Sequence, residues 1–231
     1  MNLEFNLVKF PIIFPLIYGG ILYLLPGLET YLIFFTILLL AETHFGATWP
    51  FFLNSANTKF IKENRITLIS FPAIIATASL IGFLFLKPTF LIIFFAINMY
   101  HVTRQSFGVC KLYTKEISQI KYQENFIYIF NFIFFLIGFF RFYFPIINPN
   151  HIFSLNIIIV ILIFTTLIIY FFRYKFSDSF YTFVTGILIF YPICFVANPV
   201  HAIIMGVTMH YTQYLYLTYN VCKQRKNNTT K

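Results

Sequence analysis

The sequence predicts an all-α fold: a polytopic integral membrane bundle of about eight transmembrane helices. Of the 231 residues, 59% are hydrophobic and only 10% are charged, whereas a soluble domain carries about 25% charged residues. Apolar runs of roughly 20 residues, the length at which a helix crosses a bilayer, recur along the whole chain. These runs are continuous and do not alternate with polar residues, which favours helices over a β-barrel.

Eight apolar spans follow one another, each roughly as long as a bilayer requires. Gly27 and Pro199 supply the breaks where two pairs of spans lie closest together. The longest loops, 54–65 and 110–125, are too short to build a soluble core, so residues 1–231 are expected to form a single transmembrane domain. The predicted spans are 8–27, 30–53, 66–86, 89–109, 126–147, 154–172, 179–197 and 199–221.

The basic residues indicate how the bundle is oriented. Counted over termini and loops, 13 Lys and Arg residues fall on one side of the membrane, against Lys87 alone on the other. Cytoplasmic loops carry the excess of Lys and Arg, so both termini are expected in the cytoplasm, in a protein of the bacterial inner membrane. This bias accounts for the net charge of +9, and no nucleic-acid partner is expected. The expected partners are the lipid bilayer and an apolar small molecule.

Three histidines lie at matched depth in the bundle. His44, His101 and His210 fall within about two residues of the centres of the second, fourth and eighth spans, roughly 3 Å along a helix axis. Imidazoles at one depth on three helices predict a metal site. His201 is the fourth candidate ligand, but it lies nine residues before His210, roughly 13 Å away on the opposite helix face. It joins the site only if the helix breaks, for example at Gly206. A single intramembrane histidine would more simply serve as a hydrogen-bond partner between helices.

Polar neighbours about one helical turn from these histidines are candidates to hold the imidazole rings. Glu42 is the only acid at mid-membrane, and its side chain is expected to point some 200° away from that of His44. Three roles for Glu42 stay open: a metal ligand after local distortion, an ion pair with Arg104 or Arg141, or a protonated hydrogen-bond donor. The complete set of supporting candidates is Thr48, Asn98, Gln105, Gln213 and Glu42.

The histidine pattern resembles the Brp/Blh family of membrane β-carotene 15,15'-dioxygenases. The likeness rests on His-Phe-Gly at 44–46, on His101 57 residues after His44, on the late histidines and on the Pro199-Val-His201 run. The resemblance implies a small all-helical protein that binds Fe(II) through histidines and cleaves a carotenoid-like substrate in a long apolar cavity. The chain differs from the family in having Thr48 and Gln105 where the family tends to have aspartate, and in the nine residues between its late histidines.

Four classes of function follow from these observations. The leading one is a multi-pass membrane metalloenzyme, an iron-dependent oxygenase acting on an apolar lipid or carotenoid-like substrate, since imidazole ligands suit iron or copper. The second is an electron-transfer protein with haem held by two histidines, although the chain has no CxxCH motif. The third is a transporter or channel whose polar intramembrane path includes the histidines and Glu42. The fourth is a structural or assembly subunit.

Overall fold

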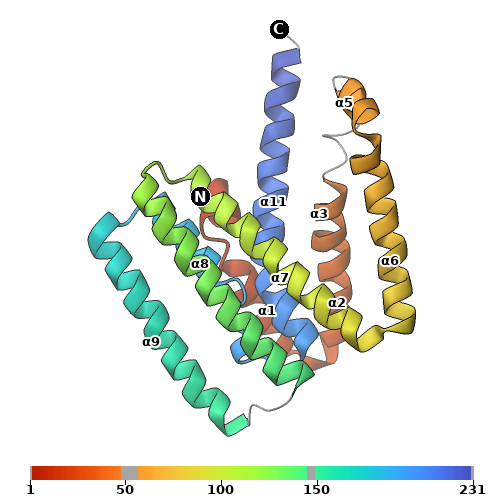
Figure 1. The fold of residues 1–231 in the computed structure, drawn as a ribbon. Coiled ribbons are helices and arrows are strands. Elements are labelled where there is room, and N and C mark those ends of the chain that lie inside the picture. Colours follow the sequence, from red (N-terminus) through yellow and green to blue (C-terminus); the bar gives the residue numbers. More distant parts are fainter. Residues whose placement is uncertain (1, 48–56, 145–148, 230–231) are drawn as a thin grey trace.

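The computed structural model describes residues 2–47, 57–144 and 149–229, and Figure 1 gives the course of the chain. Within those ranges all regular structure is helical and no strand occurs, so the predicted all-α class is confirmed. The first six elements are η1 (Phe5–Lys9), α1 (Ile13–Leu24), η2 (Pro26–Leu28), α2 (Glu29–Thr36), η3 (Ile37–Glu42) and α3 (Thr43–Gly46).

The predicted first span, 8–27, is divided in two. The π-helical turn η1 ends at Lys9, and α1 begins only at Ile13 and runs for 12 residues. Pro11 lies in the gap between them, and a proline lacks the N–H that would continue the helical hydrogen bonds. In contrast, α2, η3 and α3 follow one another without a break, and they bring the chain to His44.

Long helices make up most of the remaining chain. In Figure 1, α7 and α8 lie side by side, α9 lies beyond α8, and α11 stands between α7 and α3. The helix α11 has 31 residues, and its C-terminal part extends past the rest of the bundle (Figure 1). The remaining elements are α5 (Thr58–Glu63), η5 (Ile66–Ser70), α6 (Phe71–Phe85), α7 (Lys87–Leu112), α8 (Ile117–Gly138), η6 (Phe139–Tyr143), α9 (Pro149–Tyr174), α10 (Asp178–Leu188), η7 (Tyr191–Cys194) and α11 (Pro199–Thr229).

Among the described residues, four helical segments are long and apolar enough to cross a membrane, which indicates a membrane protein. They are Pro26–Gly46, Ile66–Phe85, Ile117–Tyr143 and His151–Tyr174. The second of these has no buried residue in its most apolar window, so most of its apolar side chains are exposed, as lipid-facing side chains are.

The other predicted spans are either too short or not apolar enough to count as membrane-crossing helices. The segments Ile13–Leu24 and Asp178–Cys194 are apolar but shorter than 18 residues. The helices α7 and α11 have 26 and 31 residues, which is long enough, but polar side chains including the site histidines lower their hydropathy. Eight crossings therefore stay a prediction, while four membrane-length helices are observed.

A close approach of backbones fixes α11 against the end of α10. A Cβ atom built on Gly206 would lie 1.8 Å from the carbonyl oxygen of Ile189 and 3.4 Å from Cδ of Pro192. Only glycine permits this contact. Because His210 lies one turn further along α11, the contact at Gly206 sets how deeply His210 enters the bundle.

Candidate metal centre

The three histidines predicted at one depth do meet in space. His44 comes from α3, His101 from α7 and His210 from α11, and one ring nitrogen or more of each lies within 4.8 Å of the others. The ring centroids of His44 and His210 are 4.9 Å apart, and those of His101 and His210 are 6.1 Å apart. Nitrogen ligands of a tetrahedral ion lie about 3.3 Å apart, given metal–nitrogen bonds of about 2.0 Å. Small side-chain rotations would close the observed group onto one ion.

Two of the three rings are buried with a nitrogen that has no protein partner. His44 is 5% exposed and His210 is 2% exposed. Within the described part of the chain, Nδ1 of His44 and Nε2 of His210 form no hydrogen bond. A buried polar atom without a partner costs about 1–3 kcal/mol, and a bound ion or an ordered water is one explanation for such an atom. A metal ion between the rings would satisfy both.

Aromatic side chains hold the His44 ring in place. The ring of Tyr214 lies 4.2 Å from it, edge to face, and the rings of Phe45 and Tyr211 lie 5.3 and 5.4 Å away. Since the tyrosines belong to α11 and His44 to α3, these contacts tie the two ligand-bearing helices together. They also surround the cluster with apolar surface, which strengthens electrostatic interactions inside it.

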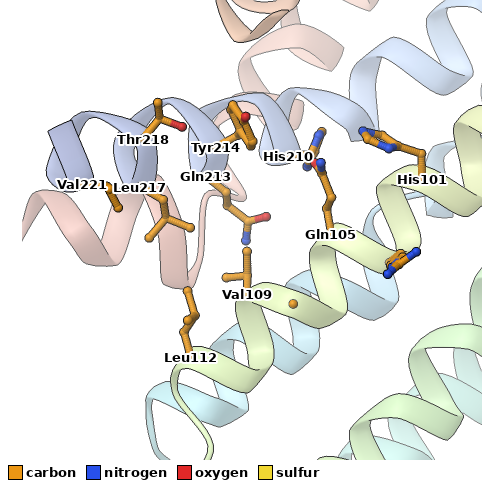
Figure 2. A pocket seen from close by; sticks show the side chains of 12 residues that line it. His101, Gln105, Val109, Leu112, His210, Gln213, Tyr214, Leu217, Thr218 and Val221 are labelled. Atoms are coloured by element: carbon orange, nitrogen blue, oxygen red, sulfur yellow. The ribbon is translucent and has the colours of Figure 1, made fainter. Parts of the chain in front are cut away.

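The third histidine faces an open groove between α7 and α11. His101 is exposed, in contrast to the two buried rings. The groove has a volume of about 610 Å³ and runs from His101 and His210 to Leu112 and Val221 (Figure 2). A bound ion would thus be shielded on the side of α3 and accessible on the side of the groove. Three protein ligands with one accessible position is the arrangement of catalytic metal sites.

Two glutamines line this groove beside the histidines. The Gln213 amide nitrogen donates a hydrogen bond to the backbone oxygen of Val8 at 2.8 Å, which fixes the amide. Figure 2 shows the side chains of Gln105 and Gln213 directed into the space between the two helices. The Oε1 atoms of both are buried and have no donor among the described residues. Each is an unused hydrogen-bond acceptor beside the groove.

The other supporting candidates are placed less directly. Asn98 is half-buried on α7, one turn before His101, but no hydrogen bond between the two appears in the described structure. Thr48 lies outside the described residues. Glu42 is exposed, and within the described ranges it forms no ion pair with Arg104 or Arg141. It therefore stays a prediction that Asn98 orients a histidine ring and that Glu42 takes part in the metal site.

The structure does not bring His201, the fourth candidate ligand, into the cluster. The α11 helix continues through Gly206, so His201 stays on a different face. His201 is 1% exposed, and both of its ring nitrogens have partners. Its Nδ1 lies 2.7 Å from the Tyr18 hydroxyl and its Nε2 lies 2.6 Å from Oε1 of Glu29. His201 therefore links α1, α2 and α11, and it has no free nitrogen for a metal.

Sequence reasoning missed the residues that hold His201. Tyr18 and Glu29 are 183 and 172 residues away from it in sequence. Glu29 lies at the very start of the second apolar span, where an acid looks like an ordinary helix-starting residue. Only its position in an otherwise apolar chain signals that it needs a partner.

Comparison of the chain with protein-family models, with curated proteins and with solved structures found no match. The class of protein is thus defined by the fold and the site: an all-helical chain with membrane-length helices and a three-histidine cluster at the head of an open groove.

Proposed function

We propose that this protein is an integral membrane metalloenzyme in which His44, His101 and His210 hold one transition-metal ion. The observation that carries the proposal is a buried nitrogen on each of His44 and His210 that has no partner among the described residues, beside an accessible third imidazole. A purely structural cluster would be expected to satisfy these nitrogens with protein hydrogen bonds, as His201 does.

Iron is the metal that we propose, with a lipid-soluble substrate. Imidazole suits zinc, copper, iron and nickel, and no carboxylate belongs to the described cluster. When bound, Fe(II) would supply the activation of O₂, and the protein would supply binding, orientation and exclusion of water. Carotenoid cleavage, the narrower form of this proposal, is supported by the sequence resemblance alone.

For the pair His44 and His210, direct ligation fits the ring geometry better than haem. The His44 and His210 rings meet edge to face, at 70°, with centroids 4.9 Å apart. Two axial ligands of haem lie on opposite faces of a porphyrin. Because the His44 and His210 rings are in edge contact, a porphyrin does not fit between them. For this reason the proposal uses a directly ligated ion.

The residues around the ion have distinct roles in this proposal. The buried rings of His44 and His210 form the fixed part of the ligand set, because Tyr214 and Tyr211 hold His44 against α11. His101 completes the set from the groove side. The oxygen of Gln213, whose amide is fixed by Val8, is available to accept a hydrogen bond from the substrate and orient it.

We further propose that the chain crosses the membrane eight times with both termini in the cytoplasm. The charge bias of the loops supports this topology. The polar faces of α7 and α11 would be covered by the bundle and by the occupied groove, so these helices would cross despite their lower hydropathy.

The proposed function is tested with protein purified without oxygen, loaded with Fe(II) and reconstituted in nanodiscs. O₂ consumption and substrate products are followed with β-carotene and with long-chain lipids. Substrate-dependent O₂ consumption that is lost in His210→Ala but kept in His151→Ala supports an oxygenase. Fe-loaded protein that consumes no O₂ with any lipid overturns the oxygenase, and intact β-carotene beside another oxidised lipid overturns carotenoid cleavage alone.

A further inference from the structure

The lining of the groove changes character along its length. At the histidine end it is polar, with Arg104, Gln105 and Gln213 beside the cluster. Toward the other end the lining is mostly apolar. It consists there of Val109, Leu112, Leu217 and Val221, with Thr218 beside them. A fully apolar substrate would give the polar side chains at the histidine end no hydrogen-bond partner, and burying unpaired polar groups is costly. A ligand with one polar end and one apolar chain matches both halves.

The length of the groove suits a single hydrocarbon chain. From Arg104 to Leu112 on α7 the chain advances by eight residues, which span about 12 Å at 1.5 Å per residue. An extended chain with carbon–carbon bonds of about 1.5 Å advances about 1.25 Å per carbon. The groove therefore accommodates roughly 9 or 10 carbons between Arg104 and its far end, and the remaining carbons of a longer chain extend beyond it.

Arg104 defines the charge of the polar end. It lies on α7 one turn after His101, on the rim of the groove, and it is exposed. Within the described residues no carboxylate forms an ion pair with it. An arginine side chain within a membrane segment costs free energy unless an anion pairs with it or water hydrates it. The side-chain amide of the adjacent Gln105 forms no hydrogen bond to another described residue, so its N–H₂ can turn to the same anion.

We propose that the groove binds a single-chain lipid carboxylate, with its carboxylate on Arg104 and its chain along Val109, Leu112 and Leu217. A guanidinium pairs with a carboxylate through two parallel hydrogen bonds. One arginine balances the single charge of a carboxylate, whereas a phosphate monoester carries up to two charges. The proposal rests on the proposed function for one statement only: that the bound lipid is the substrate of the metal centre. Its binding is independent of the metal.

The test measures binding of radiolabelled palmitate to the full chain in nanodiscs, with metal content measured on the same samples. Arg104→Gln should weaken palmitate binding roughly tenfold or more, the loss expected for a charge-assisted hydrogen bond. Arg104→Lys should restore part of the affinity. Lys111→Gln is the matched control, because Lys111 is an exposed cation on α7 outside the groove lining, and it should leave binding unchanged.

Three competing ligands identify the polar end. Unlabelled palmitate should displace the label, and hexadecanol and hexadecyl phosphate should displace it at least tenfold less well. Equal competition by hexadecanol, or unchanged palmitate binding by Arg104→Gln, overturns the proposal, because Arg104 then only reaches water at the membrane surface. Stronger competition by hexadecyl phosphate overturns the carboxylate assignment in favour of a phosphate. Arg104-dependent binding by protein that holds no metal would leave this proposal standing and refute the metal centre.

Discussion

Replacing Gly206 by alanine tests how the helix packing positions the metal centre. The added methyl group would lie 1.8 Å from the carbonyl oxygen of Ile189 and 2.9 Å from its carbonyl carbon. To reach ordinary contact at 3.4 Å, α11 and the backbone at Ile189 must separate by about 1.6 Å. Overpacking typically costs about 1–3 kcal/mol, and we expect about 3 kcal/mol or more here because the obstacle is backbone.

The same displacement of α11 should also move His210 relative to His44 and His101. His210 lies one turn after Gly206, and its nitrogen lies within 4.8 Å of those on His44 and His101. The histidine nitrogens, which lie within 4.8 Å of one another, must approach to about 3.3 Å to bind one ion. A shift of about 1.6 Å in the wrong direction is as large as that approach. Gly206→Ala should therefore lower metal retention as well as stability.

Unfolding is followed by far-ultraviolet circular dichroism during SDS titration, together with metal content. Gly20→Ala is the matched control, because a Cβ on Gly20 in α1 meets nothing within 4 Å. That control should be neutral or stabilising by about 0.4–1 kcal/mol. If Gly206→Ala unfolds at the same point as the wild type and keeps its metal, the close contact of α11 with Ile189 does not position the site.

Three further predictions concern parts of the molecule outside the cluster. His201→Phe should lower the free energy of unfolding by about 1–3 kcal/mol, because Tyr18 and Glu29 lose their shared partner, and metal content measured on the same protein should not change. Burial, with a hydrogen bond to Glu4 at 2.7 Å, raises the pKa of Tyr113. Its contribution to stability is therefore full below about pH 10 and falls as the pH rises above that value, and Tyr113→Phe should flatten this part of a measured stability–pH curve. Reporter fusions at the C-terminus should be active with a cytosolic reporter, and activity of a periplasmic reporter there would refute the orientation.

The hydropathy of the sequence predicted where the helices lie, but not where they break. Each predicted span corresponds to a helix or to consecutive helical segments as far as the structure describes it, and the ends 48–53 and 145–147 of two spans lie outside the described residues. Helix α8, however, begins at Ile117 instead of residue 126, because Gln119 and Gln123 are buried by hydrogen bonds to the Tyr170 hydroxyl. A polar stretch looks like a loop in a hydropathy plot, and the partner that buries it lies about 50 residues away.

The depth of the histidines could be counted from the sequence, because depth depends only on distance from a span centre. Counting brought His44, His101 and His210 to one level, and the structure brings them together. Which face each helix turns inward depends on packing, and this is why counting could not pair His201 with Tyr18 and Glu29. Counting did not predict the groove either, since Arg104 and Leu112 line a groove only when α11 packs beside α7.

The central claim is that three histidines hold one ion, and metal content tests it most directly. Protein expressed with iron and purified without oxygen is analysed for metal by mass spectrometry, as wild type and as His44→Ala, His101→Ala and His210→Ala. His201→Ala and the exposed His151→Ala are the controls. We expect about one ion per wild-type chain, kept in both controls and lost from each of the three ligand variants. Folded wild-type protein that binds no transition metal, or ligand variants that all retain it, would contradict the account.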